Sequence, residues 1–322
     1  MDIIGKKAQK EYFDTVIRKK NLGHFYILEG ARGVGKKTLT DYIAASIHCK
    51  STNAPCGVCG SCLKHRSGNH PDYIEIKNDD PDKKTVTVET IRKYAKDIYT
   101  KPLLADTKVY VLTDRIPLGR EGQNAFLKVL EEPPSYAVIV ILVNNSDVLL
   151  PTVKSRGNIC HIDNCTKEET INFILKNCPE AADKAEIIAS FSQGNLGAAL
   201  SLAVESEFFI QRRELFDLLT YINKGKRSGL CEVVSYFSGH KDSVQTLLEL
   251  LISWLRDALY IKTTGSGNLI NKDYSELLSG FAFSVTTVKI IKTLEAAQEM
   301  AAKFSKGNNT EIWAADLMMK LG

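Results

Sequence analysis

The chain has 322 residues, of which 44% are hydrophobic and 25% charged, a composition typical of a globular protein with more than one domain. The formal net charge of +4 is compatible with a nucleic acid nearby, but it excludes the strongly basic composition that would by itself indicate one. The first residues lack the apolar core of a signal peptide and the longest apolar run, YAVIVILV, is too short to span a bilayer, so we expect a cytoplasmic protein with no membrane contact.

The first strong pattern is a short apolar run that ends in a glycine-rich segment. HFYILEG at 24–30 predicts a buried strand, and a helix is expected from about Lys36. Gly30, Gly35 and Lys36 fit the spacing G-x-x-x-x-G-K, in which backbone N–H groups and the helix N-terminus favour a phosphate group. A glycine turn that starts a helix without any ligand is the alternative interpretation. The candidate phosphate loop comprises Gly30, Gly33, Gly35, Lys36, Lys37 and Thr38.

This candidate phosphate loop departs from its pattern at the position that should bind magnesium. A Ser or Thr hydroxyl is needed there, and Lys37 offers an ammonium group without a lone pair. Thr38 takes that position only if the register shifts, which would place Lys36 where the second glycine belongs. The sequence therefore predicts a loop that can accept phosphate but is impaired in holding the metal. Whether ATP is bound stays open at this point.

Four of the eight cysteines lie close together in the sequence. They are Cys49, Cys56, Cys59 and Cys62. The spacing C-x6-C-x2-C-x2-C supplies four thiolates for a closed, structural zinc site. An iron–sulfur cluster is the alternative, although the downstream cysteine followed by proline is absent, and unliganded thiols are a third interpretation. His48 and His65 flank the segment, and we interpret them as exposed histidines, with substitution for a cysteine ligand as the alternative.

Strands and helices continue to alternate up to about residue 163. The runs DYIEIK, KVYVLTD, YAVIVILVNN and NICHID predict strands, while TVETIRKYAKDIY and EGQNAFLKVLEEPP predict helices, the second of which stops at Pro133 and Pro134. This alternation indicates a parallel sheet covered on both faces. KVYVLTD ends in Thr113 and Asp114, where a P-loop ATPase needs an Asp for magnesium. Thr113 is thus a second lesion at the same ion, and Asp114 is either a shorter acid at the position of the base or a capping carboxylate.

After about Asp163 the strand pattern stops and the chain is predicted to be helical. A small helical stretch runs to about Glu205, and amphipathic helices follow. One apolar stripe in them comprises Val244, Leu248, Leu251 and Leu255. The predicted fold class is therefore α/β, a P-loop domain with a parallel sheet followed by two helical parts. The predicted domains are 1–163, which contains the cysteine module at about 49–62, then 164–206 and 207–322.

The segments GARGVGKK, KVYVLTD, NAFLKVLEEPP and LLPTVKSRGN, with the four cysteines between the first two, resemble the AAA+ clamp-loader family. The resemblance covers most of the chain. It implies an AAA+ domain with a zinc module, a small helical lid domain and a C-terminal helical collar domain for oligomerisation. It also implies a role in DNA replication within the DNA polymerase III holoenzyme, a DNA-directed DNA polymerase. The implied partners are the clamp-loader motor subunits, the delta subunit, the sliding clamp and, through the complex, primed DNA.

The same resemblance implies roles for single residues. Motor subunits of the family carry Ser-Arg-Cys, whose arginine reaches into the ATP site of the neighbouring subunit. Here Ser155 and Arg156 match and Gly157 replaces the cysteine, so the resemblance implies that Arg156 acts in trans. An ordinary surface arginine is the alternative. SQGNLGAAL resembles the sensor helix, with Gly197 where motor subunits have an arginine, and Asn144 falls at the first sensor position.

These features predict a non-hydrolysing subunit that packs against an ATP-binding motor subunit and donates Arg156 to its site. Lys37, Thr113 and Gly197 argue against the alternative, a motor subunit of the same family that hydrolyses ATP itself. A free-standing module that binds zinc and nucleic acid is the third hypothesis. The lack of clustered aromatic and basic residues argues against that module.

Overall fold

The computed structural model describes residues 3–78, 83, 85–113, 117–222, 228–265, 269–303 and 309–321. Contacts within the chain divide it into two compact units. Unit 1 comprises Met1–Ala182 and Ser192–Leu200, and unit 2 comprises Asp183–Phe191 and Ser201–Gly322. The segment predicted as a separate lid, 164–206, is thereby shared between the two units. The three-domain boundaries stay a prediction.

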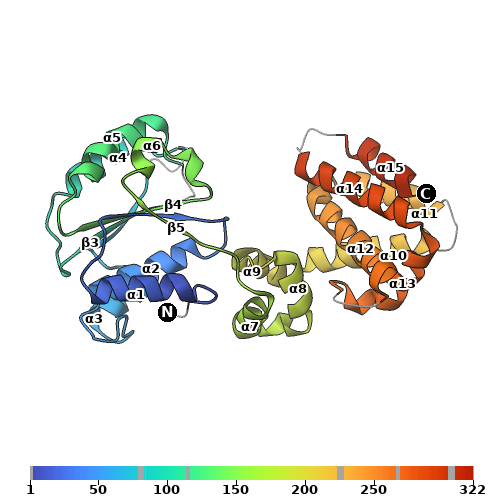
Figure 1. Ribbon diagram of the computed structural model, residues 1–322, viewed down its shortest axis with the longest axis horizontal. Coiled ribbons are helices and arrows are strands. Elements are labelled where there is room, and N and C mark those ends of the chain that lie inside the picture. The colour runs from blue at the N-terminus through green and yellow to red at the C-terminus, as the bar shows by residue number, and fades with distance from the viewer. Residues whose placement is uncertain are drawn as a thin grey trace. The chain divides into compact units, whose positions relative to one another are not determined.

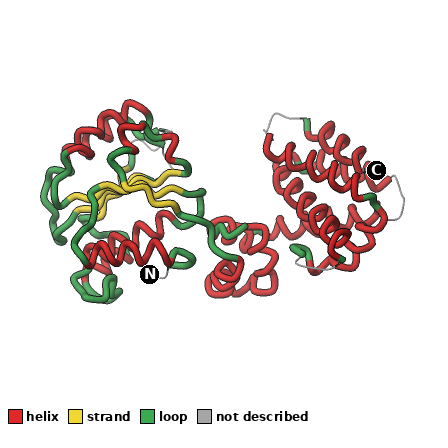
Figure 2. The backbone as a smooth tube through the Cα atoms, viewed as in Figure 1, coloured by secondary structure: helices red, strands yellow, loops and turns green. Residues whose placement is uncertain are grey.

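Unit 1 is built around a parallel sheet of five strands in the order β2-β3-β4-β1-β5. The strands are β1 (Phe25–Glu29), β2 (Tyr73–Ile76), β3 (Lys108–Leu112), β4 (Ala137–Val143) and β5 (Asn158–His161). Figure 2 shows them side by side between layers of helix. All five strands expected from the apolar runs are present, and the α/β fold class is confirmed.

Helices cover both faces of this sheet, as Figure 1 shows. They are α1 (Lys7–Arg18) and α2 (Lys36–His48) on one face and α4 (Val88–Asp97), α5 (Arg120–Glu131) and α6 (Pro151–Lys154) on the other. Successive strand residues point to opposite faces. In β1, Tyr26 and Leu28 therefore pack with α1 and α2, while Phe25 and Ile27 pack with α4, α5 and α6. Burial of both faces explains why the strands are nearly continuous apolar runs.

Local sequence signals account for the helix ends in unit 1. The α5 helix stops at Glu131 because Pro133 cannot continue it, as predicted. The short α3 (Gly60–Arg66) lies between α2 and β2. After β5 comes α7 (Lys167–Asn177), where Thr166 and Glu169 form a capping box with N–H···O distances of 2.8 and 3.2 Å. The short 3-10 helix η1 (Ser146–Val148) follows β4.

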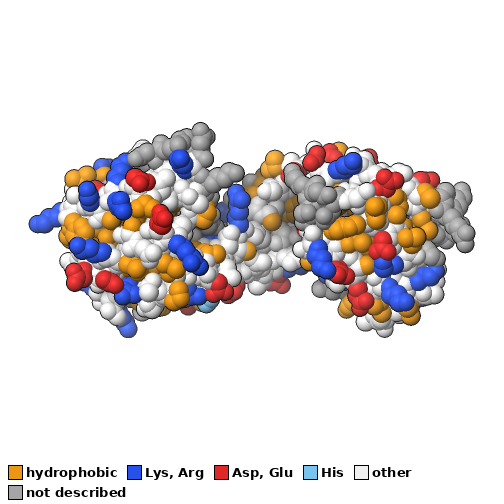
Figure 3. Space-filling model, turned by 90° about the horizontal axis from the view of Figure 1, so that it is seen from above, with side chains coloured by type: hydrophobic (Ala, Val, Ile, Leu, Met, Phe, Trp, Pro, Cys, Tyr) orange, Lys and Arg blue, Asp and Glu red, His pale blue; other side chains and the backbone are white. Residues whose placement is uncertain are grey.

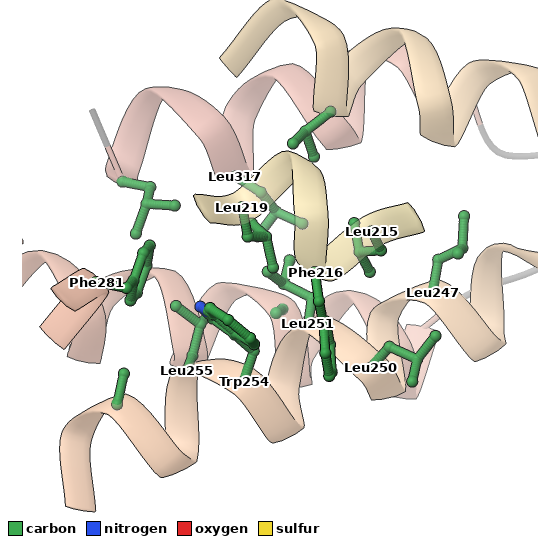
Figure 4. Packing of buried hydrophobic residues seen from close by; sticks show 14 of the residues in the cluster. Leu215, Phe216, Leu219, Leu247, Leu250, Leu251, Trp254, Leu255, Phe281 and Leu317 are labelled. Carbon is green, nitrogen blue, oxygen red and sulfur yellow. The ribbon is translucent and has the colours of Figure 1, made fainter. Parts of the chain in front are cut away.

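Unit 2 consists of helices, and the described residues after β5 form no further strand, as the sequence predicts. Its core surrounds Trp254, which packs against Phe216 and Phe281 with ring-centroid distances of 4.7 and 5.8 Å (Figure 4). The predicted stripe from Val244 to Leu255 is buried in this core. The helices from α8 on are α8 (Ala185–Ser192), α9 (Leu196–Val204), α10 (Ser206–Ile222), α11 (Ser228–Gly239), α12 (Val244–Thr264), α13 (Ser275–Ser284), α14 (Thr287–Lys303) and α15 (Thr310–Leu321), with 3-10 helices η2 (Pro179–Lys184), η3 (Lys241–Ser243) and η4 (Lys272–Tyr274).

Within the described residues, no single helix has both the length and the apolar character needed to cross a membrane. The segments Lys272–Ser284 and Thr287–Lys303 meet that criterion only together, with a bend of 112° between them. Ile290 and Ala297 of α14 are buried in the core of unit 2.

Surface charge on the described residues is mixed. Figure 3 shows Lys and Arg side chains on the viewed face of each unit lying among acidic and apolar side chains. This distribution agrees with the small net charge of +4, and charge on that face does not mark a nucleic-acid contact.

Candidate functional site

The loop between β1 and α2 has the backbone shape of a phosphate loop. β1 ends at Glu29, and the N–H of Gly30 donates to the carbonyl of Val143 at 3.1 Å. Gly33 and Gly35 have φ of +86° and +105°, a backbone conformation that residues with a Cβ rarely adopt. Gly35 is the N-cap of α2, so the loop leads directly into a helix N-terminus whose first N–H groups lack partners within the helix.

Lys36 is buried and is bonded within the loop. Its Nζ donates to the carbonyl of Gly30, to the carbonyl of Ala31 at 3.0 Å and to Oδ1 of Asn144 at 3.3 Å. Asn144, at the predicted first sensor position, therefore contacts the lysine that a phosphate would otherwise engage. These bonds give the ammonium group polar partners from the chain itself.

Lys37 has partners of a different kind. Its Nζ lies 2.6 Å from Oδ1 of Asp41 and 3.0 Å from the hydroxyl of Tyr73, which also donates to Asp41. Burial, followed by the charge of Asp41, raises the pKa of Tyr73, so the phenol keeps its proton. An ammonium group in this cluster cannot ligate magnesium. Thr38 is exposed on the next position of α2.

A pocket of about 380 Å³ lies beside the loop. The start of α9 contacts the loop here, because the N–H of Gly197 donates to the carbonyl of Gly33 at 2.9 Å. A Cβ at Gly197 would lie 2.7 Å from Cα of Gly33, which is too close for a side chain unless the loop moves. The motor subunits' sensor arginine therefore does not fit at Gly197 in this arrangement. The pocket lining includes Lys6, Arg32, Thr38, Phe173 and Leu200.

The predicted second acidic element is described only in part. Thr113 follows β3 directly and is half-buried. Asp114 lies outside the described residues. The structure thus places Thr113, which has a hydroxyl and no carboxylate, at the carboxyl end of β3, and the lost magnesium contact stays a prediction.

The four cysteines predicted to bind zinc lie together. Their Sγ atoms are all within 4.8 Å of one another, and Sγ of Cys59 is 3.9 Å from Sγ of Cys49. A tetrahedral zinc site with Zn–S bonds of about 2.3 Å has edges of about 3.8 Å. The donor set therefore fits a closed four-thiolate site and can hold a metal ion.

Backbone N–H groups in the segment point at the sulfur atoms. Cys56 donates to Sγ of Cys49 at 3.4 Å, Cys59 donates to Sγ of Cys56 at 3.4 Å, and Cys62 donates to Sγ of Cys59 at 3.5 Å. The N–H groups of Val58 and Cys59 lower the pKa of Cys56, whereas burial raises the pKa of Cys62. A bound cation supplies the positive charge that a buried thiolate needs.

The structure corrects the interpretation of the flanking histidines. His48 and His65 were expected to be exposed, but they are only 3% and 8% exposed and pack against a third buried histidine, His70. Nδ1 of His48 lies 2.8 Å from Nε2 of His65. Neither is needed in the cysteine cluster, where four sulfur ligands already converge.

Arg156 lies in an exposed loop after α6. Its guanidinium donates to the carbonyl of Thr152 at 2.7 Å and forms an ion pair of 2.7 Å with Glu131, the last residue of α5. A Cβ at Gly157 would lie 2.7 Å from Cδ1 of Ile27, so the family's cysteine does not fit here without repacking of β1. In this position 34% of the Arg156 side chain is exposed.

Sequence reasoning missed the partners that hold the loop. Asp41 had a usable signal, because Lys37 and Asp41 are spaced i, i+4 on a helix. No sequence signal pointed to Tyr73 or Asn195, because both are distant in sequence from the loop that they contact. The amide of Asn195 donates to the carbonyl of Arg32 at 2.7 Å and so ties the segment before α9 to the loop.

A glycine loop between β1 and α2, on a parallel sheet of order β2-β3-β4-β1-β5, defines an α/β protein of the P-loop type. The family described as "DNA polymerase III, delta subunit" matches residues 5–166. The family described as "DNA polymerase III, delta subunit, C terminal" matches residues 206–321. The chain belongs to this DNA polymerase III delta-subunit family, and the predicted clamp-loader resemblance is confirmed.

Individual relatives carry names from the same polymerase. The chain is 32% identical over 207 residues to DNA polymerase III subunit gamma of Buchnera aphidicola subsp. Schizaphis graminum, an alignment that covers 62% of this chain and 56% of that protein. It is 24% identical over 292 residues to DNA polymerase III subunit delta' of Bacillus subtilis, covering 88% and 87%. A solved gamma-subunit-related protein from Thermotoga maritima aligns over 97% of both chains with 17% identity and a TM-score of 0.46. The chain thus spans little more than half of the Buchnera relative.

Proposed function

We propose that the chain is a non-hydrolysing, delta-prime-type subunit of the DNA polymerase III clamp loader. The observation that carries this proposal is the position of Lys37, whose ammonium group pairs with Asp41 where a magnesium-binding hydroxyl is required. Thr113 at the end of β3 supports it, because the second protein ligand for the same ion is also missing.

The proposed partners follow from the family. The subunit assembles in the cytoplasm with ATP-binding motor subunits and the delta subunit, and the complex loads the sliding clamp on primed DNA. In this proposal residues 164–206 act as the lid domain and 207–322 as the oligomerisation collar. Bacillus subtilis delta', which aligns over most of this chain, supports the delta-prime assignment.

Arg156 is the residue through which this subunit is proposed to act on a neighbour. Hydrogen bonds to Thr152 and Glu131 hold its guanidinium group in place. A planar group with several donors can neutralise charge that develops on a transferred phosphoryl group, from a side that the neighbour's own residues do not reach. For this role, the guanidinium of Arg156 must leave its ion pair with Glu131 and bind the nucleotide phosphates of the neighbouring subunit instead.

The cysteine cluster is proposed to hold zinc in a structural role. Four thiolates fill a tetrahedral zinc site and leave no position for substrate or water. The cluster links the end of α2, through Cys49, to the start of α3, through Cys59 and Cys62. Zinc here stabilises this part of unit 1 and takes no part in a chemical step.

The purified chain alone is expected to show no ATP turnover above background. Lys37 and Thr113 replace both protein groups that would hold the metal, so any bound nucleotide lacks a positioned magnesium ion. Phosphate release measured with and without magnesium tests this, with Lys36→Ala as the matched control, because its rate should equal that of the unmodified chain. Magnesium-dependent hydrolysis that disappears in Lys36→Ala would show a motor subunit instead.

Replacement of Cys56 by serine is expected to remove one equivalent of zinc. A serine hydroxyl is not a good ligand for this ion, and three thiolates hold it far less well than four. Elemental analysis of untagged protein purified without chelator measures the content, and Cys231→Ser, an exposed cysteine outside the cluster, is the control that should keep the metal. Iron in place of zinc, or unchanged zinc in Cys56→Ser, contradicts the assignment.

A further inference from the structure

Three buried histidines form a second cluster in unit 1. His48 is the last residue of α2, His65 lies in α3 and His70 precedes β2. Each is less than 10% exposed, and the three rings stack pairwise with centroid distances of 4.3 to 5.0 Å. Imidazole is a polar group, and three of them rarely share a core without a partner that satisfies their nitrogen atoms.

The ring nitrogens converge as metal ligands do. One nitrogen from each ring lies within 4.8 Å of the others, and Nδ1 of His48 and Nε2 of His65, which share a hydrogen bond, are 2.8 Å apart. A tetrahedral site with metal–nitrogen bonds of about 2.05 Å has edges of about 3.3 Å, which lies between these two distances. An ion among the three nitrogens would replace the hydrogen bond between His48 and His65 and move these two nitrogens apart. The ligand set shares no residue with the cysteine cluster.

Both nitrogens of His70 have hydrogen-bond partners in the chain. The N–H of Asp72 donates to Nδ1 of His70 at 3.2 Å, and the hydroxyl of Ser61 lies 3.0 Å from Nε2 of the same ring. Nε2 of His48 is buried and makes no hydrogen bond of normal geometry, although the Thr107 backbone lies close enough to favour a proton on it.

A buried negative charge lies next to the histidines. Asp72 is fully buried, and its carboxylate accepts the backbone N–H groups of Leu103, Leu104 and Ala105 at 2.6 to 2.8 Å, which stabilises the charged form. Burial lowers the pKa of His48 and of His70, and the charge of this carboxylate opposes that shift in part. No cationic side chain among the described residues forms an ion pair with Asp72, so a cation in the cluster would balance it.

The other charges that face the cluster are lysines. Lys37 disfavours positive charge on His65, and Lys64 disfavours it on His70. Lys37 is itself paired with Asp41, which weakens its effect.

We propose that His48, His65 and His70 form a second metal site, which binds a divalent ion of the zinc type. Imidazole nitrogen is a ligand that suits zinc and its neighbours in the first transition row. The ion would connect the end of α2, helix α3 and the segment before β2, and the first two of these are also linked by the cysteine cluster. The site is structural, and it is independent of the proposed zinc in the cysteine cluster.

Metal stoichiometry tests the second site directly. The untagged chain is equilibrated with excess Zn²⁺, freed of unbound ion on a desalting column, and analysed for zinc. Two equivalents are expected in the unmodified chain, and one in the double variant His65→Gln with His70→Gln. Cys56→Ser with Cys59→Ser should also hold one. His161→Gln, which changes an exposed imidazole, is the matched control and should hold two.

Cobalt substitution separates the sites even where a histidine variant does not fold. Thiolate-to-cobalt charge transfer arises only from the cysteine cluster, so two bound cobalt ions with charge transfer from one of them support the proposal in the unmodified chain. A chain that binds one ion, loses it in the cysteine variant and keeps it in the histidine variant overturns the second site and leaves the cysteine assignment intact. A second ion that is lost equally in His161→Gln is adventitious and also overturns it.

Discussion

Replacement of Arg156 by alanine is expected to slow ATP hydrolysis in the reconstituted clamp loader, at the one site that faces this chain. Arginines that act across an interface in phosphoryl transfer contribute about 10³ to 10⁵ in rate, so the loss at that site should be large. Because a loader has several ATP sites, total ATPase should fall in part and clamp loading should fall further. DNA-stimulated ATPase and clamp loading are the measurements, beside assembly by gel filtration.

Matched variants separate this role from a merely structural one. Arg156→Lys should restore little, because an ammonium group cannot reproduce the planar two-pronged contact. Lys154→Ala removes a nearby half-buried cation that pairs with Asp147, and it should leave all rates unchanged. Assembly should be normal in each case, since Arg156 is an exposed loop residue. A fully assembled Arg156→Ala complex with unchanged rates would leave this subunit as a scaffold.

Replacement of Trp254 by alanine is expected to destabilise unit 2 by about 3–5 kcal/mol. The indole is fully buried between Phe216, Tyr274 and Phe281, and its removal leaves a cavity in the middle of the core (Figure 4). Denaturant unfolding followed by tryptophan fluorescence reports on unit 2, because Trp254 and Trp313 both lie in it. Trp313 remains as the reporter in the variant.

A second variant tests why the effect is large. Nε1 of Trp254 is buried without a hydrogen-bond partner, so Trp254→Phe removes an unsatisfied donor along with part of the ring. We expect it to cost less than about 1.5 kcal/mol. Phe283→Ala, which removes an aromatic ring that is 75% exposed, is the control and should change the free energy of unfolding little. Equal losses in Trp254→Ala and Phe283→Ala would contradict the assignment of this core.

The α/β architecture could be predicted because both faces of the sheet are buried. Because both faces are buried, each strand has a nearly continuous apolar sequence, and residues such as Pro133 mark where the intervening helices stop. The unit boundaries could not be predicted in the same way. The division of α9 near Leu200 depends on which residues pack together in space, and no change of composition marks it.

Spacing along the chain decided how much of the candidate site was predictable. The phosphate loop and the four cysteines are each confined to a short segment of the chain, so closeness in sequence predicts that their residues are close in space. The contact of Lys36 with Asn144 requires β1 and β4 to be neighbours, which depends on strand order. His70 joins His48 and His65 because α2, α3 and the start of β2 converge, and no spacing rule for metal ligands describes that set.

The sheet order also determines when unit 1 can fold during synthesis. β1 pairs with β4 and β5, with Phe25 opposite Ile139 and Tyr26 opposite Asn158, whereas β2 and β3 pair over a much shorter stretch of chain. At a translation rate of about 5–20 residues per second, β1 leaves the ribosome roughly ten seconds before its partners. For that interval the apolar strand that leads into the phosphate loop lacks both of its partner strands, and an unpaired apolar strand of this kind is prone to aggregate.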